Sequence, residues 1–168
     1  LTAAEEAQGL VATPFGETPL VFVHSGQIPL DMTLSDIIRA HSGALDKTPG
    51  GDSLRLILRP ANVSPTGYIA KAIPGMAEAL EQARGRNDLP IAATDQDNME
   101  MLRRIPGAFA SMTLAQLAME PNALQHVRVS GTEPSIKMMK QGKYSYKLGM
   151  TLVAKAEPMP VLQRFFAY

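Results

Sequence analysis

The stretch Leu54–Gly67, LRLILRPANVSPTG, decides the fold class of this chain. An apolar run ends in Arg59, and after a short turn Ser64-Pro65-Thr66-Gly67 has the composition of a helix start. A strand that carries a guanidinium to its carboxyl end is thus followed by hydroxyls and free N–H groups at the positive end of a helix dipole. This arrangement predicts an anion-binding corner.

Strands alternate with helices on both sides of this stretch. Pro19–His24 is a continuous apolar run, which predicts a strand buried on both faces. A helix is expected behind Thr33, and the helical pattern of 65–86 must break at Pro74-Gly75. The other predicted elements are strands at 89–93, 108–112, 124–129 and 146–154, and helices at 3–10, 94–104, 113–120, 134–141 and 160–166. The alternation predicts an α/β fold with ligands bound at the carboxyl ends of strands.

Composition excludes several classes of function. The 168 residues contain 16 basic and 16 acidic side chains without a basic block, which disfavours a nucleic-acid partner. Cysteine is absent, so thiol nucleophiles and thiolate metal sites are excluded. His41 and His126 lack metal-ligand spacing, and no nucleotide-binding or nucleophile motif occurs. The sequence therefore predicts no metal, no cofactor and no apolar run long enough to span a membrane.

Several segments match, in order, the motifs of a known family. Arg59–Thr66 resembles the anion loop Arg-x-x-Gly-Ser-Gly-Thr, and Arg104–Phe109 resembles the return strand Pro-Gly-x-Ile-Gly-Tyr of phosphate-type (type II) periplasmic solute-binding proteins of ABC importers. Further resemblances are found at 34–43, 129–134, 142–145 and 148–153. The resemblance implies a type II periplasmic-binding-protein-like fold, in which two lobes are joined by hinge strands.

The resemblance also implies how the chain is divided. Residues 1–25 would be a linking segment and the first hinge strand, 26–110 the second lobe, and 111–168 the return to the first lobe. Members of the family have a further N-terminal segment that supplies much of the first lobe. The first lobe is therefore expected to be incomplete here, and a missing N-terminal segment or a second chain would complete it.

The implied function is capture of a small, phosphate-like oxyanion between two lobes, without covalent chemistry. The expected partners are the membrane subunits of an ABC importer, and the expected location is periplasmic or extracellular, with the signal peptide outside this sequence. Two alternatives remain open: a ligand-sensing regulatory domain of the same fold, and an α/β enzyme that uses Arg59 as a substrate clamp with Thr94, Asp95 or His24 as its reactive group.

The predicted ligand contacts of the first corner are hydrogen-bond donors. Arg59 offers a bidentate fork, hydroxyls and an amide can add to it, and the first N–H groups of the helix converge on the same point. In the alternative interpretation, these residues have only structural roles: Ser64 is an ordinary N-cap and Arg59 an ordinary strand-end charge. The loop is one residue longer than the family's and lacks its Asp, which leaves the identity of the anion open. The predicted contacts of this corner are Arg59, Asn62, Ser64, Thr66 and Gly67.

Thr94 and Asp95 occupy a second strand-to-helix corner, where the family has Gly-Asn. A hydroxyl or a backbone N–H from this corner can reach the ligand. Because a carboxylate repels a dianion, capping of the helix is the favoured role for Asp95.

Overall fold

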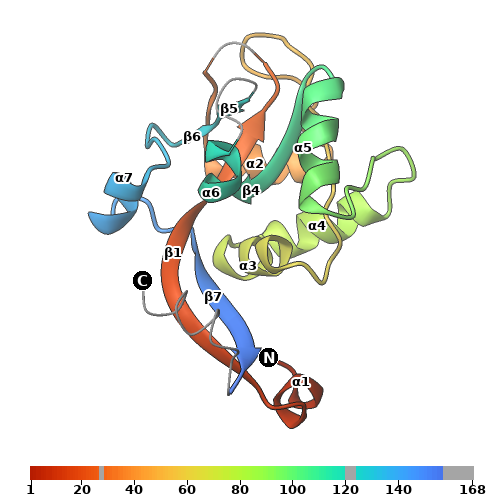
Figure 1. The fold of residues 1–168 in the computed structure, drawn as a ribbon. Helices are drawn as coiled ribbons and strands as arrows, with labels where there is room; N and C mark the ends of the chain where they lie inside the picture. Colours follow the sequence, from red (N-terminus) through yellow and green to blue (C-terminus); the bar gives the residue numbers. More distant parts are fainter. Residues whose placement is uncertain (27–28, 120–123, 157–168) are drawn as a thin grey trace. The chain divides into compact units, whose positions relative to one another are not determined.

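The computed structural model describes residues 1–26, 29–119 and 124–156, which fall into two compact units. One unit comprises Leu1–Glu17 with the described part of Gly149–Tyr168, and the other comprises Thr18–Leu148. Two strands, β1 (Leu10–His24) and β7 (Lys147–Lys155), contribute residues to both units (Figure 1). This division into two units does not test the predicted lobe boundaries near residues 25 and 110, which remain a prediction.

The smaller unit contains a strand that the sequence did not indicate. Helix α1 (Ala3–Ala7) is capped by Thr2 and ends before Gly9, and β1 begins directly afterwards at Leu10. The sequence predicts no strand before Pro19, because Gly9 and Thr13-Pro14 indicate a break in regular structure. In the structure the first residues of β1 are mostly exposed. Pairing with β7, from the other end of the chain, supplies the hydrogen bonds that local sequence cannot specify.

A mixed sheet organises the larger unit, in the order β3-β4-β1-β5. Strand β3 (Arg55–Leu56) lies parallel to β4 (Ala108–Thr113), which lies antiparallel to β1, and β1 pairs antiparallel with β5 (Gln125–His126). The mixture of sheet and covering helices confirms the α/β prediction (Figure 1).

The two faces of this sheet contribute to two hydrophobic clusters. In β1, Leu20 and Phe22 belong to the cluster that includes residues of α2, α3 and α4, whereas Val21 and Val23 belong to the cluster of α5 and α6. Residues 20–23 are fully buried, which confirms the prediction of a strand covered on both faces. The helices of this unit are α2 (Leu34–Ser42), α3 (Ser64–Ala72), α4 (Met76–Arg84), α5 (Asp95–Arg104), α6 (Leu114–Ala118) and α7 (Ile136–Lys140).

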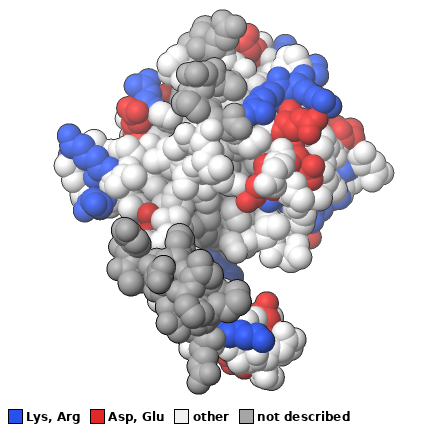
Figure 2. Space-filling model, viewed as in Figure 1, with Lys and Arg blue, Asp and Glu red and all other residues white. Residues whose placement is uncertain are grey.

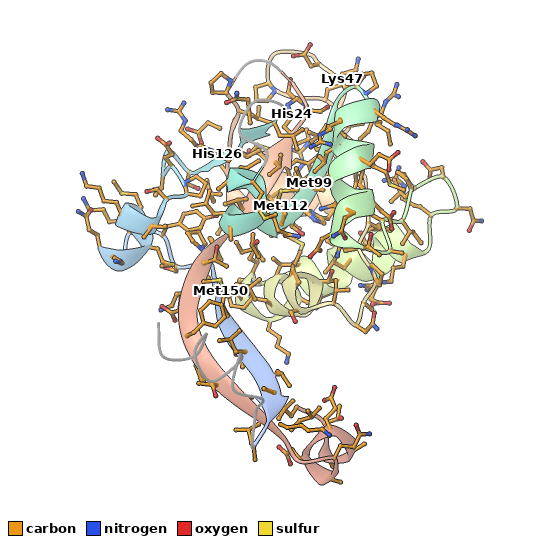
Figure 3. The ribbon with its side chains drawn as sticks, viewed as in Figure 1. His24, Lys47, Met99, Met112, His126 and Met150 are labelled. Atoms are coloured by element: carbon orange, nitrogen blue, oxygen red, sulfur yellow. The ribbon has the colours of Figure 1, made fainter. Side chains whose placement is uncertain are left out.

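The predicted break between α3 and α4 is confirmed. Pro74 and Gly75 separate the two helices, and Gly75 adopts a left-handed conformation with φ 84° as the N-cap of α4. Met99 of α5 packs in the same buried hydrophobic cluster as Met112 of β4 (Figure 3).

Three predicted strands differ from the structure. The run 54–59 forms only the two-residue β3, although Ile57 and Leu58 still donate backbone hydrogen bonds to Phe109 and Pro90. The run 89–93 is reduced to a single bridge between Ile91 and Leu58. The run 124–129 is divided between two sheets, since β5 joins β1 while β6 (Arg128–Val129) pairs in parallel with β2 (Asp31–Met32).

The predicted closing helix at 160–166 lies outside the described residues. Over the ranges that the structure describes, no helix has the length and apolar character needed to cross a membrane.

Candidate functional site

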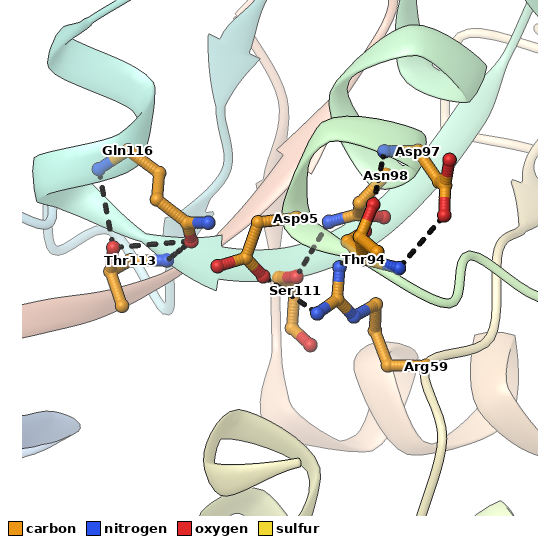
Figure 4. A network of polar contacts seen from close by, with 8 residues as sticks. All are labelled: Arg59, Thr94, Asp95, Asp97, Asn98, Ser111, Thr113 and Gln116. Atoms are coloured by element: carbon orange, nitrogen blue, oxygen red, sulfur yellow. Dashed lines mark hydrogen bonds and ion pairs between the residues drawn. The ribbon is translucent and has the colours of Figure 1, made fainter.

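Arg59 lies at the end of the extended segment that follows β3, and its side chain is only 6% exposed. Its Nη1 donates to the backbone oxygen of Thr94 at 2.5 Å, and its Nη2 donates to Oδ1 of Asp95 at 2.6 Å (Figure 4). The guanidinium therefore ties the strand end at residue 59 to the start of α5. Arg59 is not a solvated strand-end charge, because its side chain is buried and makes two hydrogen bonds.

One donor of this buried cation has no partner. The Nε of Arg59 is inaccessible to solvent and makes no hydrogen bond with the described part of the protein. A buried donor without an acceptor costs roughly 1–3 kcal/mol, and more when the group is charged. Arg59 thus retains hydrogen-bonding capacity beyond its contacts with Thr94 and Asp95.

Helix α3 begins without a side-chain cap. Its N-cap is Val63, and Ser64 and Pro65 are the first two helical residues, so the interpretation of Ser64 as the N-cap is wrong. The first N–H groups of a helix have no acceptor within the helix, and Pro65 has no N–H to satisfy. The N–H groups of Ser64 and Thr66 are therefore the donors that this helix start offers.

The predicted side chains of the first corner differ in exposure. Thr66 is 3% exposed, whereas Ser64 is exposed and Asn62 lies in an exposed turn before the helix. None of these three side chains hydrogen-bonds to Arg59 in the described structure, so Arg59 and the start of α3 are joined through the short chain segment between them.

Gly67 does not offer its N–H as predicted. That group donates to the backbone oxygen of Val63 at 3.1 Å and completes the first turn of α3. Gly67 has no left-handed φ, and a Cβ placed on it would meet nothing within 4 Å. Neither backbone geometry nor close packing requires a glycine at this position.

At the second corner, side chains of the corner itself accept the hydrogen bonds of its backbone N–H groups. Thr94 is the N-cap of α5, and its Oγ accepts from the N–H of Asp97 at 3.1 Å, while Asp97 accepts from the N–H of Thr94 at 2.9 Å. These hydrogen bonds with Thr94, and the charge of Arg59 to a smaller degree, hold the pKa of Asp97 below its usual value. The predicted capping role of Asp95 is wrong: Asp97 completes the capping box, and Asp95 pairs with Arg59.

Sequence reasoning missed Asn98 and Ser111 beside this corner. Asn98 is 1% exposed, its Nδ2 donates to the backbone oxygen of Ser111 at 3.2 Å, and its Oδ1 has no partner in the described structure (Figure 4). The available signal was an amide at a helix position that neighbours the core residues Met99 and Leu102.

His24, the third reactive group considered for an enzyme, is a buried packing residue. It is 3% exposed, and its Nδ1 accepts from the N–H of Gly26 at 3.2 Å. Burial lowers the pKa of His24, which favours the neutral imidazole. Over the described residues, no group of three or more His, Asp or Glu side chains is arranged to hold a metal ion.

Two open hollows touch the predicted residues from different sides. One of about 590 Å³ lies between α3 and α4 and reaches Thr66, but Glu78 and Glu81 line its other wall. Another of about 500 Å³ lies between α5 and α6 and reaches Asp95. Basic and acidic side chains stand next to each other on the surface where α5 lies (Figure 2). Neither hollow therefore offers an anion a set of contacts as suitable as the donors of Arg59, Ser64 and Thr66.

Comparison with solved structures shows which known proteins have a similar fold. A protein assigned as a phosphate ABC transporter substrate-binding protein, from Clostridium perfringens and with bound phosphate, matches 99% of the chain with a TM-score of 0.75 and 16% identity. The chain has the fold of these binding proteins. PstS from Borrelia burgdorferi matches with a TM-score of 0.65 and 20% identity, and an ABC-type phosphate transport receptor from Vibrio cholerae with 0.57 and 10%, each over 99% of the chain.

The match to these binding proteins is structural and partial. The chain covers 67% of the Clostridium protein and 68% of each of the other two. Its sequence matches no protein-family model and no curated protein. The fold predicted from the ordered motifs is therefore confirmed, although overall identity to these structures is low.

Proposed function

We propose that this chain is part of an extracytoplasmic solute-binding protein that captures a small, phosphate-like oxyanion and delivers it to the membrane subunits of an ABC importer. The single observation that carries the proposal is the corner between residue 59 and α3. There a buried guanidinium with an unpartnered Nε precedes a helix start that has no side-chain cap. A guanidinium and the free N–H groups of a helix start are both donors suited to an anion.

The fold supports the same function. Two of the solved structures described above, those from Clostridium perfringens and Vibrio cholerae, are named as phosphate ABC-transport proteins, and the former contains phosphate. In the proposal, Arg59, Ser64 and Thr66 supply the principal contacts of the second lobe, with Asn62 at their edge. Thr94 and Asp95 act on the ligand through Arg59, and the donors of the first lobe come from outside the described chain.

Isothermal titration of the full-length protein with phosphate, sulfate, molybdate and tungstate tests the proposal. We expect heat with at least one of these anions, and Arg59→Gln should weaken that binding by about a hundredfold or more, because the positive charge of the site and its charge-assisted hydrogen bonding are removed. Arg55→Gln is the matched control, since Arg55 is an exposed arginine of β3, just before the extended segment that ends in Arg59.

Two further measurements keep this test decisive. Thermal unfolding of Arg59→Gln checks that the variant folds, and Ser64→Ala with Thr66→Val removes donors without touching the buried cation. If none of the four anions produces heat with the unsubstituted protein, the proposal of an oxyanion ligand is wrong.

A further inference from the structure

The two members of the Arg59–Asp95 pair differ sharply in exposure. The side chain of Arg59 is 6% exposed, whereas that of Asp95 is 55% exposed. The guanidinium is fixed by its burial and by the backbone oxygen of Thr94, but the carboxylate stands largely in water. Asp95 is therefore the member of the pair that an incoming ligand meets.

The first turn of α5 brings two carboxylates to this corner. Asp95 and Asp97 both belong to that turn, and Arg59 is the cation that Asp95 contacts at 2.6 Å. The carboxylate of Asp97 remains bound to Thr94, so Asp95 is the charge that acts directly on the guanidinium.

We propose that Asp95 weakens the preference of this corner for doubly charged oxyanions relative to singly charged ones. The inference rests on the proposed function and concerns the class of anion that the same site takes. An anion bound to Arg59 shares the guanidinium with Asp95, so the attraction of Arg59 is opposed by the repulsion of Asp95. Each additional charge on the ligand adds attraction to Arg59 and repulsion from Asp95, so Asp95 offsets the gain that a dianion would otherwise have.

The size of the effect of Asp95 on anion affinity follows from the short distances between the charges. A ligand that contacts Arg59 lies within a few ångströms of a carboxylate 2.6 Å from the same guanidinium. Between unit charges so close to a protein surface, the repulsion changes an affinity on the order of tenfold for each charge on the ligand. A dianion should therefore lose about ten times more affinity to Asp95 than a monoanion of the same shape.

The substitution Asp95→Asn removes this charge and so measures its effect on anion binding. The amide oxygen can still accept from Nη2 of Arg59, and Nη1 remains bound to the backbone oxygen of Thr94. Position 95 is exposed at the first turn of α5, while the capping box of Thr94 and Asp97 is unaffected. The substitution should thus leave the orientation of Arg59 unchanged.

Sulfate and perchlorate are the probes, because both are tetrahedral and neither has a proton at neutral pH, while sulfate carries one charge more. Their binding to the full-length protein is measured at constant ionic strength by titration, and by the increase in thermal stability where binding is weak. Glu100→Gln is the matched control, since it removes one carboxylate from α5 that pairs with Arg104 instead.

We expect Asp95→Asn to strengthen sulfate binding about tenfold more than perchlorate binding, and Glu100→Gln to leave their ratio unchanged. An unchanged ratio in Asp95→Asn would overturn the inference while leaving the proposed function intact. An equal loss of both affinities would also overturn it, because Asp95 would then serve only to position Arg59. If sulfate and perchlorate bind neither to the unsubstituted protein nor to Asp95→Asn, the inference is wrong, and if phosphate, molybdate and tungstate also fail to bind, the proposed function is wrong as well.

Discussion

The two strand-to-helix corners of this protein both carry polar residues at a helix start but have opposite hydrogen-bonding states. At the start of α5, Thr94 and Asp97 satisfy each other's backbone N–H groups, whereas at the start of α3 no side chain does so. The capped corner has little left to offer an anion, and the uncapped corner retains its donors. A polar cluster at a helix start is therefore weak support for a ligand site unless its donors are free.

The corners also differ in charge, and they depend on each other. The α3 corner contributes the buried cation Arg59, and the α5 corner contributes Asp95, which pairs with it. Arg59 thus ties the segment before α3 to the start of α5, and in the proposed function Asp95 modifies a site that lies mainly on α3. Four predictions change one corner toward the other or test the contrast between them.

The largest effect is expected from giving α3 the cap that it lacks. Val63 has the extended conformation of an N-cap residue, with φ −83° and ψ 144°, so Val63→Asp can accept from the N–H of Thr66. Unfolding free energy should rise by about 1 kcal/mol, and anion affinity should fall more than tenfold, because a donor is occupied and a like charge is added. Urea unfolding and titration with phosphate measure the two effects.

Val63→Ser separates the two causes of that loss, since a hydroxyl caps the helix without adding charge. We expect a smaller loss of affinity than for Val63→Asp. Full affinity in Val63→Asp would show that the start of α3 does not contact the anion.

The next largest effect should come from removing the cap that α5 already has. In Thr94→Ala, the N–H of Asp97 loses its acceptor, and the unfolding free energy should fall by about 1 kcal/mol. Anion affinity should be unchanged, because Arg59 bonds to the backbone oxygen at position 94 and not to the side chain. A loss of affinity comparable to that of Arg59→Gln would mean that the Thr94 hydroxyl contacts the ligand.

A smaller effect, in the stabilising direction, is expected at Gly67. The helix position is free of steric contacts and its N–H is already bonded to Val63, so Gly67→Ala should raise the unfolding free energy by about 0.5–1 kcal/mol. Anion affinity should remain as it is. A marked loss of affinity would show that the ligand approaches this residue too closely for a methyl group.

The smallest effect concerns pH, because Asp97 is partly exposed and its carboxylate is screened by water. Its pKa is lowered in the folded protein by the hydrogen bonds with Thr94, so it contributes stability at pH values above the ordinary pKa of an aspartate. That contribution is lost as the pH falls through the lowered pKa. Acid titration of unfolding stability should therefore show a slightly smaller decline for Asp97→Asn than for the unsubstituted protein, and a steeper decline would contradict the assignment.

Local sequence determined the features of this protein that depend on residues a few positions apart. The cap at Thr94 acts over three residues, and the break between α3 and α4 follows from Pro74 and Gly75 themselves. The apolar run 19–24 likewise specified a buried strand, because burial on both faces requires apolar side chains at successive positions. The α/β fold and the candidate corner at Arg59 could be predicted for these reasons.

Tertiary structure alone decided which groups meet across the chain. Strand β1 extends back to Leu10 because β7 pairs with it, and exposed residues of mixed polarity carry no signal of such a partner. Asp95 pairs with Arg59 across 36 residues, which no local pattern encodes. The sequence by itself therefore placed the donors of the candidate site, but only the folded chain determined which of them are already satisfied, because hydrogen bonding and charge pairing depend on distances that exist only after folding.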